Sequence, residues 1–245
     1  AFALSVHPDL AKENDNIFTV YYNLADEMKL IAKYLSSVNA KDVASLYINT
    51  PEDKVAINKY FKKELKRKNI DFLGSETYSF NSKSVKNQLL KLKSLKPEYI
   101  TTIDFGYMYP TILKEARSIG IRDKIIGGLG LMTAPEMRGE LTKNLVYACS
   151  SFIIEPTDRY KKFNNKYNSK YKSRLTFDGV YTFDSIDILL NAIKKDSAHS
   201  SYFENNTFQG ISGEIRIDST GTSHVDIALA KYDEKGNTKK IQLNE

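Results

Sequence analysis

Residues 99–128, YITTIDFGYMYPTILKEARSIGIRDKIIGG, predict a strand, a helix and a second strand. YITTIDF is a short apolar run rich in β-branched residues, which is typical of a buried strand. Residues 107–119 follow with the spacing of an amphipathic helix, and Gly120 stands where helices often end in a left-handed residue. KIIGG at 124–128 then predicts the next strand. Such a unit builds a parallel sheet with a helix packed against it.

The same alternation extends to both sides of this unit. We expect further strands at 43–49, 71–78 and 145–152, and further helices at 24–38, 52–68, 82–95, 157–172 and 178–195. Thr50 followed by Pro51 is typical of a helix start, because threonine caps and proline fits the first turn. The predicted fold class is therefore α/β, with parallel, doubly wound sheets.

The composition limits the classes of function. With 245 residues, the chain has room for two domains of ordinary size. Its net charge of +6 comes mostly from lysines in predicted helices, and no nucleic-acid-binding motif accompanies them, so we interpret the charge as a solvated surface. No apolar run approaches the roughly 20 residues that span a bilayer. The opening AFALSVHPDL lacks the basic start and cleavage pattern of a signal peptide.

The residues that carry most enzyme chemistry are sparse. Cys149 is the single cysteine and lies in an apolar strand, which predicts a core residue and no internal disulfide. His7, His199 and His224 lie far apart in sequence, so we predict no metal site and no cofactor. Because GxSxG, Walker A and HExxH motifs are also missing, we predict no catalytic residues and no enzyme activity.

The last third of the chain differs in character. FQGISGEIRIDSTGT at 208–222 predicts a β-hairpin, since its glycines suit turn conformations that other residues avoid. IALAKYDEKGNTKKIQL at 227–243 predicts two more strands around a DEKGN turn. Upstream, the helix at 157–172 carries an aromatic stripe that predicts its buried side, formed by Tyr160, Phe163, Tyr167 and Tyr171.

Four stretches, in this order, resemble the type I periplasmic binding proteins, specifically the branched-chain amino-acid (Leu/Ile/Val) group of ABC-transporter receptors. They are SVHPDLAKENDNIFTVYYN at 5–23, ILKEARSIGIRDKIIGGLG at 112–130, FNNKYNSKY at 163–171 with VYTFDSIDILLNAI at 180–193, and FQGISGEIRIDSTGT at 208–222. Each motif is loose, but together they cover nearly the whole chain.

The resemblance implies two α/β lobes joined by three crossing segments. We expect a second lobe at 21–151 with 210–245, a first lobe at 1–15 with 152–209, and crossings near 16–21, 150–154 and 208–213. Family members begin with strands and helices ahead of the SVHPDL segment, so we expect the first lobe to be incomplete. The apolar faces of its two helices, which include Ile186, Leu189, Leu190 and Ile193, would then lack a sheet to cover.

Ligands of open α/β sheets bind beyond the carboxyl ends of the strands. Together with the resemblance, this rule gives the ligand-binding candidates Ser5, Val6, Asp53, Asp104, Phe105, Tyr107, Leu129, Asp178 and Tyr181. Asp104 ends an apolar strand, where it would pair with a ligand cation or instead cap the following helix. Val6 and Leu129 occupy positions where the family places a hydroxyl and an acidic residue for an amino acid, so the ligand's identity stays open.

The resemblance implies a non-catalytic extracytoplasmic binding protein that traps a small polar solute, an amino acid or a related compound, for an ABC transporter. It places the protein on the periplasmic or extracellular face of a bacterial membrane. The implied partners are the solute, a membrane permease, and a second chain or upstream segment that covers the first-lobe helices, with no specific nucleic acid. The alternative is a ligand-sensing ectodomain or lipoprotein regulator with the same fold and a degenerate site.

Overall fold

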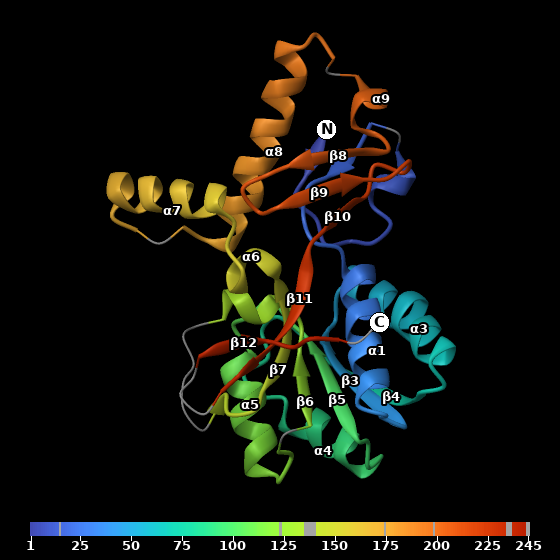
Figure 1. Ribbon diagram of the computed structural model, residues 1–245. Coiled ribbons are helices and arrows are strands. Elements are labelled where there is room, and N and C mark those ends of the chain that lie inside the picture. The colour runs from blue at the N-terminus through green and yellow to red at the C-terminus, as the bar shows by residue number, and fades with distance from the viewer. Residues whose placement is uncertain are drawn as a thin grey trace. The chain divides into compact units, whose positions relative to one another are not determined.

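The computed structural model describes residues 1–14, 16–122, 124–134, 141–173, 175–197, 199–233 and 237–243 (Figure 1). The chain forms two compact units, which we describe separately. Unit 1 contains residues 1–26 and 150–227, and unit 2 contains residues 27–149 and 228–245. The chain therefore passes between the units three times, at 26/27, 149/150 and 227/228.

Unit 2 is built on a seven-stranded sheet with the order β12-β11-β7-β6-β5-β3-β4. Its strands are β3 (Asp42–Ile48), β4 (Asp71–Tyr78), β5 (Tyr99–Ile103), β6 (Ile125–Gly127), β7 (Val146–Ser150), β11 (Ile227–Tyr232) and β12 (Thr238–Lys240). Strands β3 to β7 pair in parallel, and β11 pairs with β12 in antiparallel fashion. The predicted turn between β11 and β12 falls partly on 234–236, outside the described residues.

Helices cover both faces of this sheet. They are α1 (Leu24–Ser37), α2 (Pro51–Val55) continuing through a π-helical segment (Ala56–Phe61) into α3 (Lys62–Arg67), α4 (Lys86–Ser94), α5 (Tyr109–Ser118) and a 3-10 turn (Leu129–Thr133). The chain moves outward from β3 to β4 and then back past β3 to β5. Because such crossovers are right-handed, the connections through α2–α3 and through α4 lie on opposite faces. Val43–Ile48 is buried throughout, as expected for a strand covered on both sides.

Local signals at the helix ends agree with the sequence. The Thr50 hydroxyl accepts a hydrogen bond from the backbone N–H of Asp53 at 3.2 Å, and Pro51 is the first residue of α2. Gly120 follows α5 with φ of +81°, a left-handed conformation that glycine adopts without strain. The predictions of a cap at Thr50 and a helix end at Gly120 are confirmed.

Unit 1 has smaller sheets. Its elements are β1 (Phe2–Ala3), a 3-10 turn (Ala11–Glu13), β2 (Phe18–Thr19), α6 (Ser151–Ile154), α7 (Asp158–Tyr171), α8 (Phe177–Lys194), α9 (Ser200–Phe203), β8 (Asn206–Gln209), β9 (Glu214–Ile217) and β10 (Ser223–Val225). β1 and β2 form a parallel pair, and β8, β9 and β10 form an antiparallel sheet. The core combines these strands with α8 and α9 through Phe18, Val20, Ile188, Ala192, Phe203, Ile215 and Ile217.

The stretch at 208–222 forms the predicted hairpin, and its first two glycines have different causes. Gly213 has φ of +115°, whereas a Cβ at Gly210 would lie 2.4 Å from a carboxylate oxygen of Asp184. That carboxylate is buried and accepts hydrogen bonds from the backbone N–H groups of Ile211 and Ser212. Gly210 is therefore needed for close approach and Gly213 for its backbone conformation.

The passages lie elsewhere than the sequence suggested. The hairpin was expected to begin the crossing near 208–213, but β9 and β10 belong to unit 1 and the passage is at 227/228. The side chains of Ile215 and Ile217 are part of the unit 1 core, which explains this difference. The first passage likewise follows Asp26 rather than 16–21, since Phe18 and Val20 are buried in the same core.

The aromatic stripe of α7 is not the buried side of a helix, contrary to the prediction. None of residues 158–171, all of which are described, is buried, and Tyr171 is 56% exposed. The rings pack on one another instead, with the centroids of Tyr167 and Tyr171 4.8 Å apart. Phe163 also contacts Phe183 of α8, with centroids 4.2 Å apart. Mutual stacking therefore replaces burial under a sheet.

Helix α8 buries one side and exposes an apolar row on the other. Val180, Ile188 and Ala192 are buried. The exposed row consists of Ile186, Leu189, Leu190 and Ile193, which are 53%, 37%, 48% and 55% exposed. No described helix is long and apolar enough to cross a membrane.

Candidate functional site

The sheet of unit 2 contains a topological switch point between β3 and β5. These strands are parallel neighbours, yet the chain leaves β3 for the face that carries α2–α3 and leaves β5 for the opposite face. The contact between α4 and α5 agrees with this arrangement. The connections therefore diverge at the carboxyl ends of the two strands, and ligands of open α/β sheets bind at such a point.

Asp53 and Asp104 stand on the two sides of this switch point. Asp53 lies in the first turn of α2, after β3, and is 1% exposed. Asp104 follows β5, is 4% exposed, and accepts hydrogen bonds at Oδ2 from the backbone N–H groups of Gly106 and Met108. Both readings of Asp104 thus remain open, because it caps the turn before α5 and also lies at the switch point.

Burial changes the protonation of these carboxyl groups. It raises the pKa of Asp53 to about 7, and the charges of Glu52 and Asp104 act in the same direction. Burial also raises the pKa of Asp104, although hydrogen bonds from Tyr78 and from the backbone oppose it. Oδ2 of Asp53 is buried without a hydrogen-bond partner among the described residues. A bound cation or hydrogen-bond donor would supply what this oxygen lacks.

Glu27 is a third buried carboxyl group, which the sequence analysis missed. It reaches from α1 to the loop after β6, where Oε1 accepts a hydrogen bond from the backbone N–H of Leu129 at 3.0 Å. Burial raises its pKa to about 8. A signal was present in the sequence, because positions 24, 27 and 31 lie on one helix face and two of them are apolar. Among the described residues, no group of acidic, histidine or cysteine side chains is placed to hold a metal ion.

An exposed aromatic cluster lies beside the acidic residues. Phe80, Phe105 and Tyr107, which we call the aromatic platform, are 55%, 40% and 40% exposed. The ring of Phe80 stacks on Phe105 at 5.5 Å and on Tyr107 at 6.4 Å between centroids. The Tyr107 hydroxyl donates to the carbonyl of Phe80 at 2.9 Å. The platform therefore offers rigid apolar surface to solvent, next to Asp104 in the chain.

Phe105 and Tyr107 were candidates from the sequence, whereas Phe80 was not. Phe80 follows β4 in the same way that Phe105 follows β5. The rule that selects residues after the carboxyl ends of strands would have included it.

The candidates in unit 1 have different environments. The hydroxyl of Ser5 accepts a hydrogen bond from the backbone N–H of His7, and the carbonyl of Val6 accepts one from Leu24. Asp178 is exposed and accepts from the Tyr21 hydroxyl. Burial, together with this carboxylate, raises the pKa of Tyr21. Asp178 is thus exposed, and Ser5 and Val6 are partly buried, so all three can contact a ligand.

Two candidates are packing residues. Leu129 and Tyr181 are 0% exposed. The Tyr181 hydroxyl lies 2.9 Å from the hydroxyl of Ser150, and its ring packs against Phe177. Because both side chains are fully buried in the chain, neither is part of the candidate site.

Comparison with known proteins gives a match over nearly the whole chain. The profile of the periplasmic binding protein family matches residues 2–237. No curated protein matches the chain in sequence.

Three solved structures illustrate the similarity of fold. One is the solute-binding protein of an ABC transporter from Rhodopseudomonas palustris in complex with 3,4-dihydroxybenzoic acid. It has a TM-score of 0.81 and 17% sequence identity, and 100% of this chain matches 72% of it. A leucine-binding protein from Thermotoga maritima has a TM-score of 0.78 and 20% identity, with 97% of this chain matching 70% of it. An ABC transporter substrate-binding protein from Desulfitobacterium hafniense, in complex with leucine, has a TM-score of 0.74 and 18% identity, with 97% of this chain matching 71% of it.

These similarities confirm the predicted α/β class with parallel, doubly wound strands. They also confirm the resemblance that was inferred from four short motifs, since the family profile spans all four. The chain belongs to the periplasmic binding protein family, whose members bind substrates rather than convert them.

Proposed function

We propose that this protein is the solute-binding component of an ABC transporter, acting on the periplasmic or extracellular face of a bacterial membrane. It binds a small polar solute and presents it to a membrane permease. The observation that carries this proposal is the family match over residues 2–237, which includes both units. Two compact units joined by three passages also suit closure about a hinge, the usual way in which such proteins enclose a ligand.

In unit 2, we assign ligand contacts to Asp53, Asp104 and the aromatic platform. The platform would take the apolar or aromatic body of a solute, because stacked rings bind flat or aliphatic groups at little entropic cost. The buried carboxyl groups would take a polar group, and a positively charged one would draw the proton from Asp53. In unit 1, Ser5, the backbone of Val6 and Asp178 are the proposed contributors.

This assignment narrows the solute to molecules with one polar end and one apolar end. Leucine, which is bound in one of the similar solved structures, fits that description, whereas 3,4-dihydroxybenzoic acid, bound in another, presents a flat ring with polar groups at both ends. Val6 and Leu129 stand where the family has a hydroxyl and an acidic residue for binding an amino acid. Experiment therefore has to decide between an amino acid and an aromatic acid.

The test begins with native mass spectrometry of the purified chain to detect a co-purified solute. Calorimetric titration with leucine, benzoate and 3,4-dihydroxybenzoate then ranks the classes. Phe80→Ala should weaken the affinity by about 3- to 10-fold, the value of one stacked aromatic contact. Tyr171→Ala in unit 1 is the matched control, because its ring is exposed to a similar degree at 56%. Turnover of any of these compounds would refute the proposed binding function. Equal affinities in the two variants would refute the role of the aromatic platform.

The alternative, a ligand-sensing ectodomain or lipoprotein regulator, shares the fold. The similar solved structures from Rhodopseudomonas palustris and Desulfitobacterium hafniense are components of ABC transporters, which favours transport. Stimulation of a permease–ATPase complex in proteoliposomes distinguishes the two, since a transport receptor raises ATP hydrolysis in the presence of solute and a sensor does not.

We also propose that the exposed apolar row of α8 is covered in the working protein by an added segment or a second chain. Exposed rows of this kind in soluble proteins commonly mark interaction surfaces. The three similar solved structures extend beyond the part that this chain matches, which supports a covering segment.

A further inference from the structure

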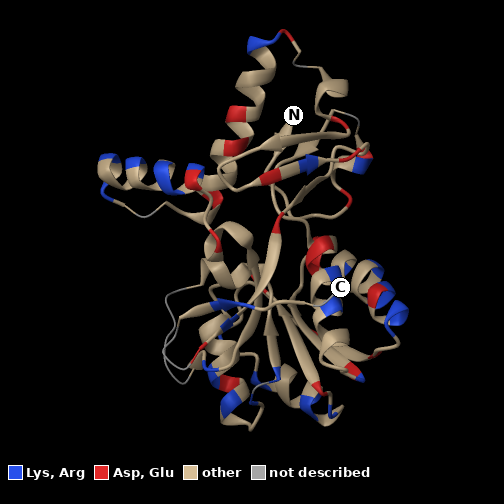
Figure 2. Cartoon of the chain, viewed as in Figure 1, with Lys and Arg blue, Asp and Glu red and all other residues tan. Residues whose placement is uncertain are grey.

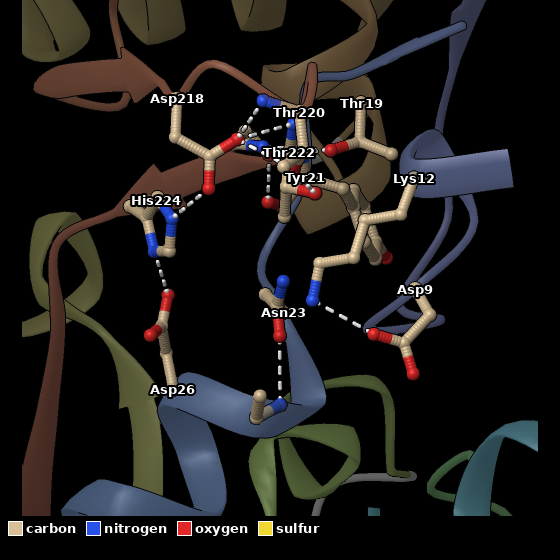
Figure 3. Close-up of polar contacts among 12 residues, drawn as sticks. Asp9, Lys12, Thr19, Tyr21, Asn23, Asp26, Asp218, Thr220, Thr222 and His224 are labelled. Carbon is tan, nitrogen blue, oxygen red and sulfur yellow. Dashed lines mark hydrogen bonds and ion pairs between the residues drawn. The ribbon is translucent and has the colours of Figure 1, made fainter. Parts of the chain in front are cut away.

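In unit 1, an imidazole lies between two carboxylates (Figure 3). Nδ1 of His224 is 2.6 Å from Oδ2 of Asp26, and Nε2 is 3.1 Å from Oδ2 of Asp218. Asp26 is the last residue of unit 1 before the first passage, and His224 stands in β10, the last strand before the third passage. The cluster thus joins two of the segments that connect the units, at the point where both leave unit 1.

The carboxylate of Asp218 is held by hydrogen bonds of its own, and Asp26 stands at a helix start. Oδ1 of Asp218 accepts from the backbone N–H groups of Thr220 and Thr222 and from the Thr220 hydroxyl, which leaves Oδ2 for the imidazole. Asp26 stands in the first turn of α1, where the side chain of Asn23 accepts from the backbone N–H of Ala25 at 2.7 Å. Asp218 is therefore held in place independently of the imidazole, whereas the carboxylate of Asp26 is carried by the first turn of α1.

Only the protonated imidazole donates from both nitrogens at once. A neutral ring has one N–H, and its other nitrogen would turn a lone pair toward a carboxylate. The hydrogen bond to Asp26 raises the pKa of His224, partial burial opposes the shift, and Asp218 supports it. Arg216, its cross-strand neighbour in β9, acts against protonation. Asp26 and Asp218 thus favour the protonated ring, and Arg216 opposes it.

Hydrogen bonds around His224 reach all three passages. Ser223 accepts from the backbone N–H of Tyr21 at 3.1 Å and donates to the Tyr21 carbonyl at 2.7 Å, which ties β10 to the first connecting segment. The backbone N–H of Ser151, just after the second passage, donates to the carbonyl of Asp226 at 3.0 Å. The strand that carries His224 thus contacts both other connecting segments.

We propose that Asp26, His224 and Asp218 form a proton-dependent clamp that holds the connecting segments together at the edge of unit 1. Below the ordinary histidine pKa of about 6.5, the clamp is complete. As the pH rises through the elevated pKa of the folded protein, the imidazole loses its proton, one hydrogen bond is lost, and the segments loosen. The stiffness of a hinge that they form would then depend on pH. The proposal rests on contacts within unit 1, so it can fail while solute binding stands.

The first measurement is a titration of the three histidine ring resonances by NMR, with His7→Gln and His199→Gln for assignment. The signal of His224 should titrate above the ordinary value of about 6.5. Asp26→Asn and Asp218→Asn should each lower that pKa, because each removes one negative partner. A pKa at or below the ordinary value, or one that neither substitution changes, would overturn the clamp.

The second measurement is hydrogen exchange at the amides of Tyr21, Ser151 and Ser223, which are hydrogen-bonded between the connecting segments. At pH 6, His224→Gln should reduce their protection factors by about tenfold, the value of a hydrogen bond to a charged group. The wild-type protein should show the same loss as the pH rises, whereas the amide of Ile188, in the core of α8, should keep its protection. His199→Gln is the matched control, since His199 is exposed in the same unit. Equal protection in His224→Gln and His199→Gln, or loss at Ile188 as well, would refute a local clamp.

Discussion

Glu27 shows how burial without a counterion governs a single carboxyl group. Its pKa is raised to about 8 by burial, so at neutral pH the folded protein holds a proton that the unfolded chain releases. The stability gained from the neutral group is fully present below the unfolded pKa, near 4.5, and is lost as the pH rises toward 8.

Glu27→Gln should therefore stabilise the protein at neutral pH. Glutamine keeps the acceptor for the backbone N–H of Leu129 and removes the ionisation penalty. We expect a gain on the order of 1–3 kcal/mol at pH 7 that shrinks toward zero near pH 4.5. Thermal unfolding between pH 4.5 and 8 measures it, with Glu13→Gln as an exposed control. A variant that is less stable than the wild type at every pH would contradict this expectation.

Cys149 gives a second expectation for one side chain. The thiol is 0% exposed, and burial raises its pKa to about 12. Since the thiolate is the reactive form, labelling by a disulfide reagent at pH 8 should be slower than in the urea-unfolded chain by about a thousandfold or more. Labelling as fast as that of a small thiol would show that β7 opens freely near the second passage.

The sequence predicted the roles of some single residues but not of others. Thr50, Gly120 and Gly213 were predictable, because caps and left-handed conformations depend on neighbours in the chain. The partners of Glu27 and Gly210, namely Leu129 and Asp184, lie more than 25 residues away, so local patterns can suggest burial of Glu27 but cannot identify these partners. The pairing of His224 with Asp26, 198 residues apart, is hidden for the same reason.

At the scale of elements, the strands β3 to β7 of unit 2 were predicted within one or two residues, and the buried strands β3, β5 and β7 were the clearest because parallel buried strands have mostly apolar sequences. Unit 1 was less predictable. The stripe on α7 has a helical period, but periodicity shows only that a face is shared and does not show what covers it. The assignment of β9 and β10 to unit 1 likewise depends on the core in which Ile215 and Ile217 are buried, which the sequence pattern does not show.

The exposed row of α8 leads to an expectation about this helix. Ile186→Gln with Ile193→Gln should change the stability of this chain by less than about 1 kcal/mol, because both side chains are more than half exposed. If a second chain covers the row, sedimentation will show an oligomer that the double variant disrupts. If an added segment covers it, a longer form of the protein will lose several kcal/mol on the same change. Val180→Gln, at a buried position of the same helix, is the destabilising control.

Charge belongs to the whole molecule. Lysine and arginine are concentrated on helices such as α3 and α7, where they alternate with few acidic residues (Figure 2). With a net charge of +6, some attraction to nucleic acid is expected, but only through phosphate contacts. Affinity for duplex DNA should fall by at least about a hundredfold between 50 and 200 mM salt and should not depend on base sequence. Fluorescence anisotropy with two unrelated duplexes checks this, and binding that survives the higher salt would contradict it.

The division of the chain between the units also determines when each can fold during synthesis. Unit 2 uses residues 27–149, but β11 lies between β7 and β12, and both β11 and β12 are made only after residues 150–227 of unit 1. Until they emerge, β7 presents an open edge, and such edges invite pairing with other chains. The nascent protein thus carries a nearly complete sheet with one exposed border for the time needed to translate about 80 residues of unit 1, roughly 4–16 seconds at ordinary elongation rates. A binding partner that shields this border during synthesis or export would raise the yield of folded protein, and loss of β11 and β12 by proteolysis would expose the edge of β7 again.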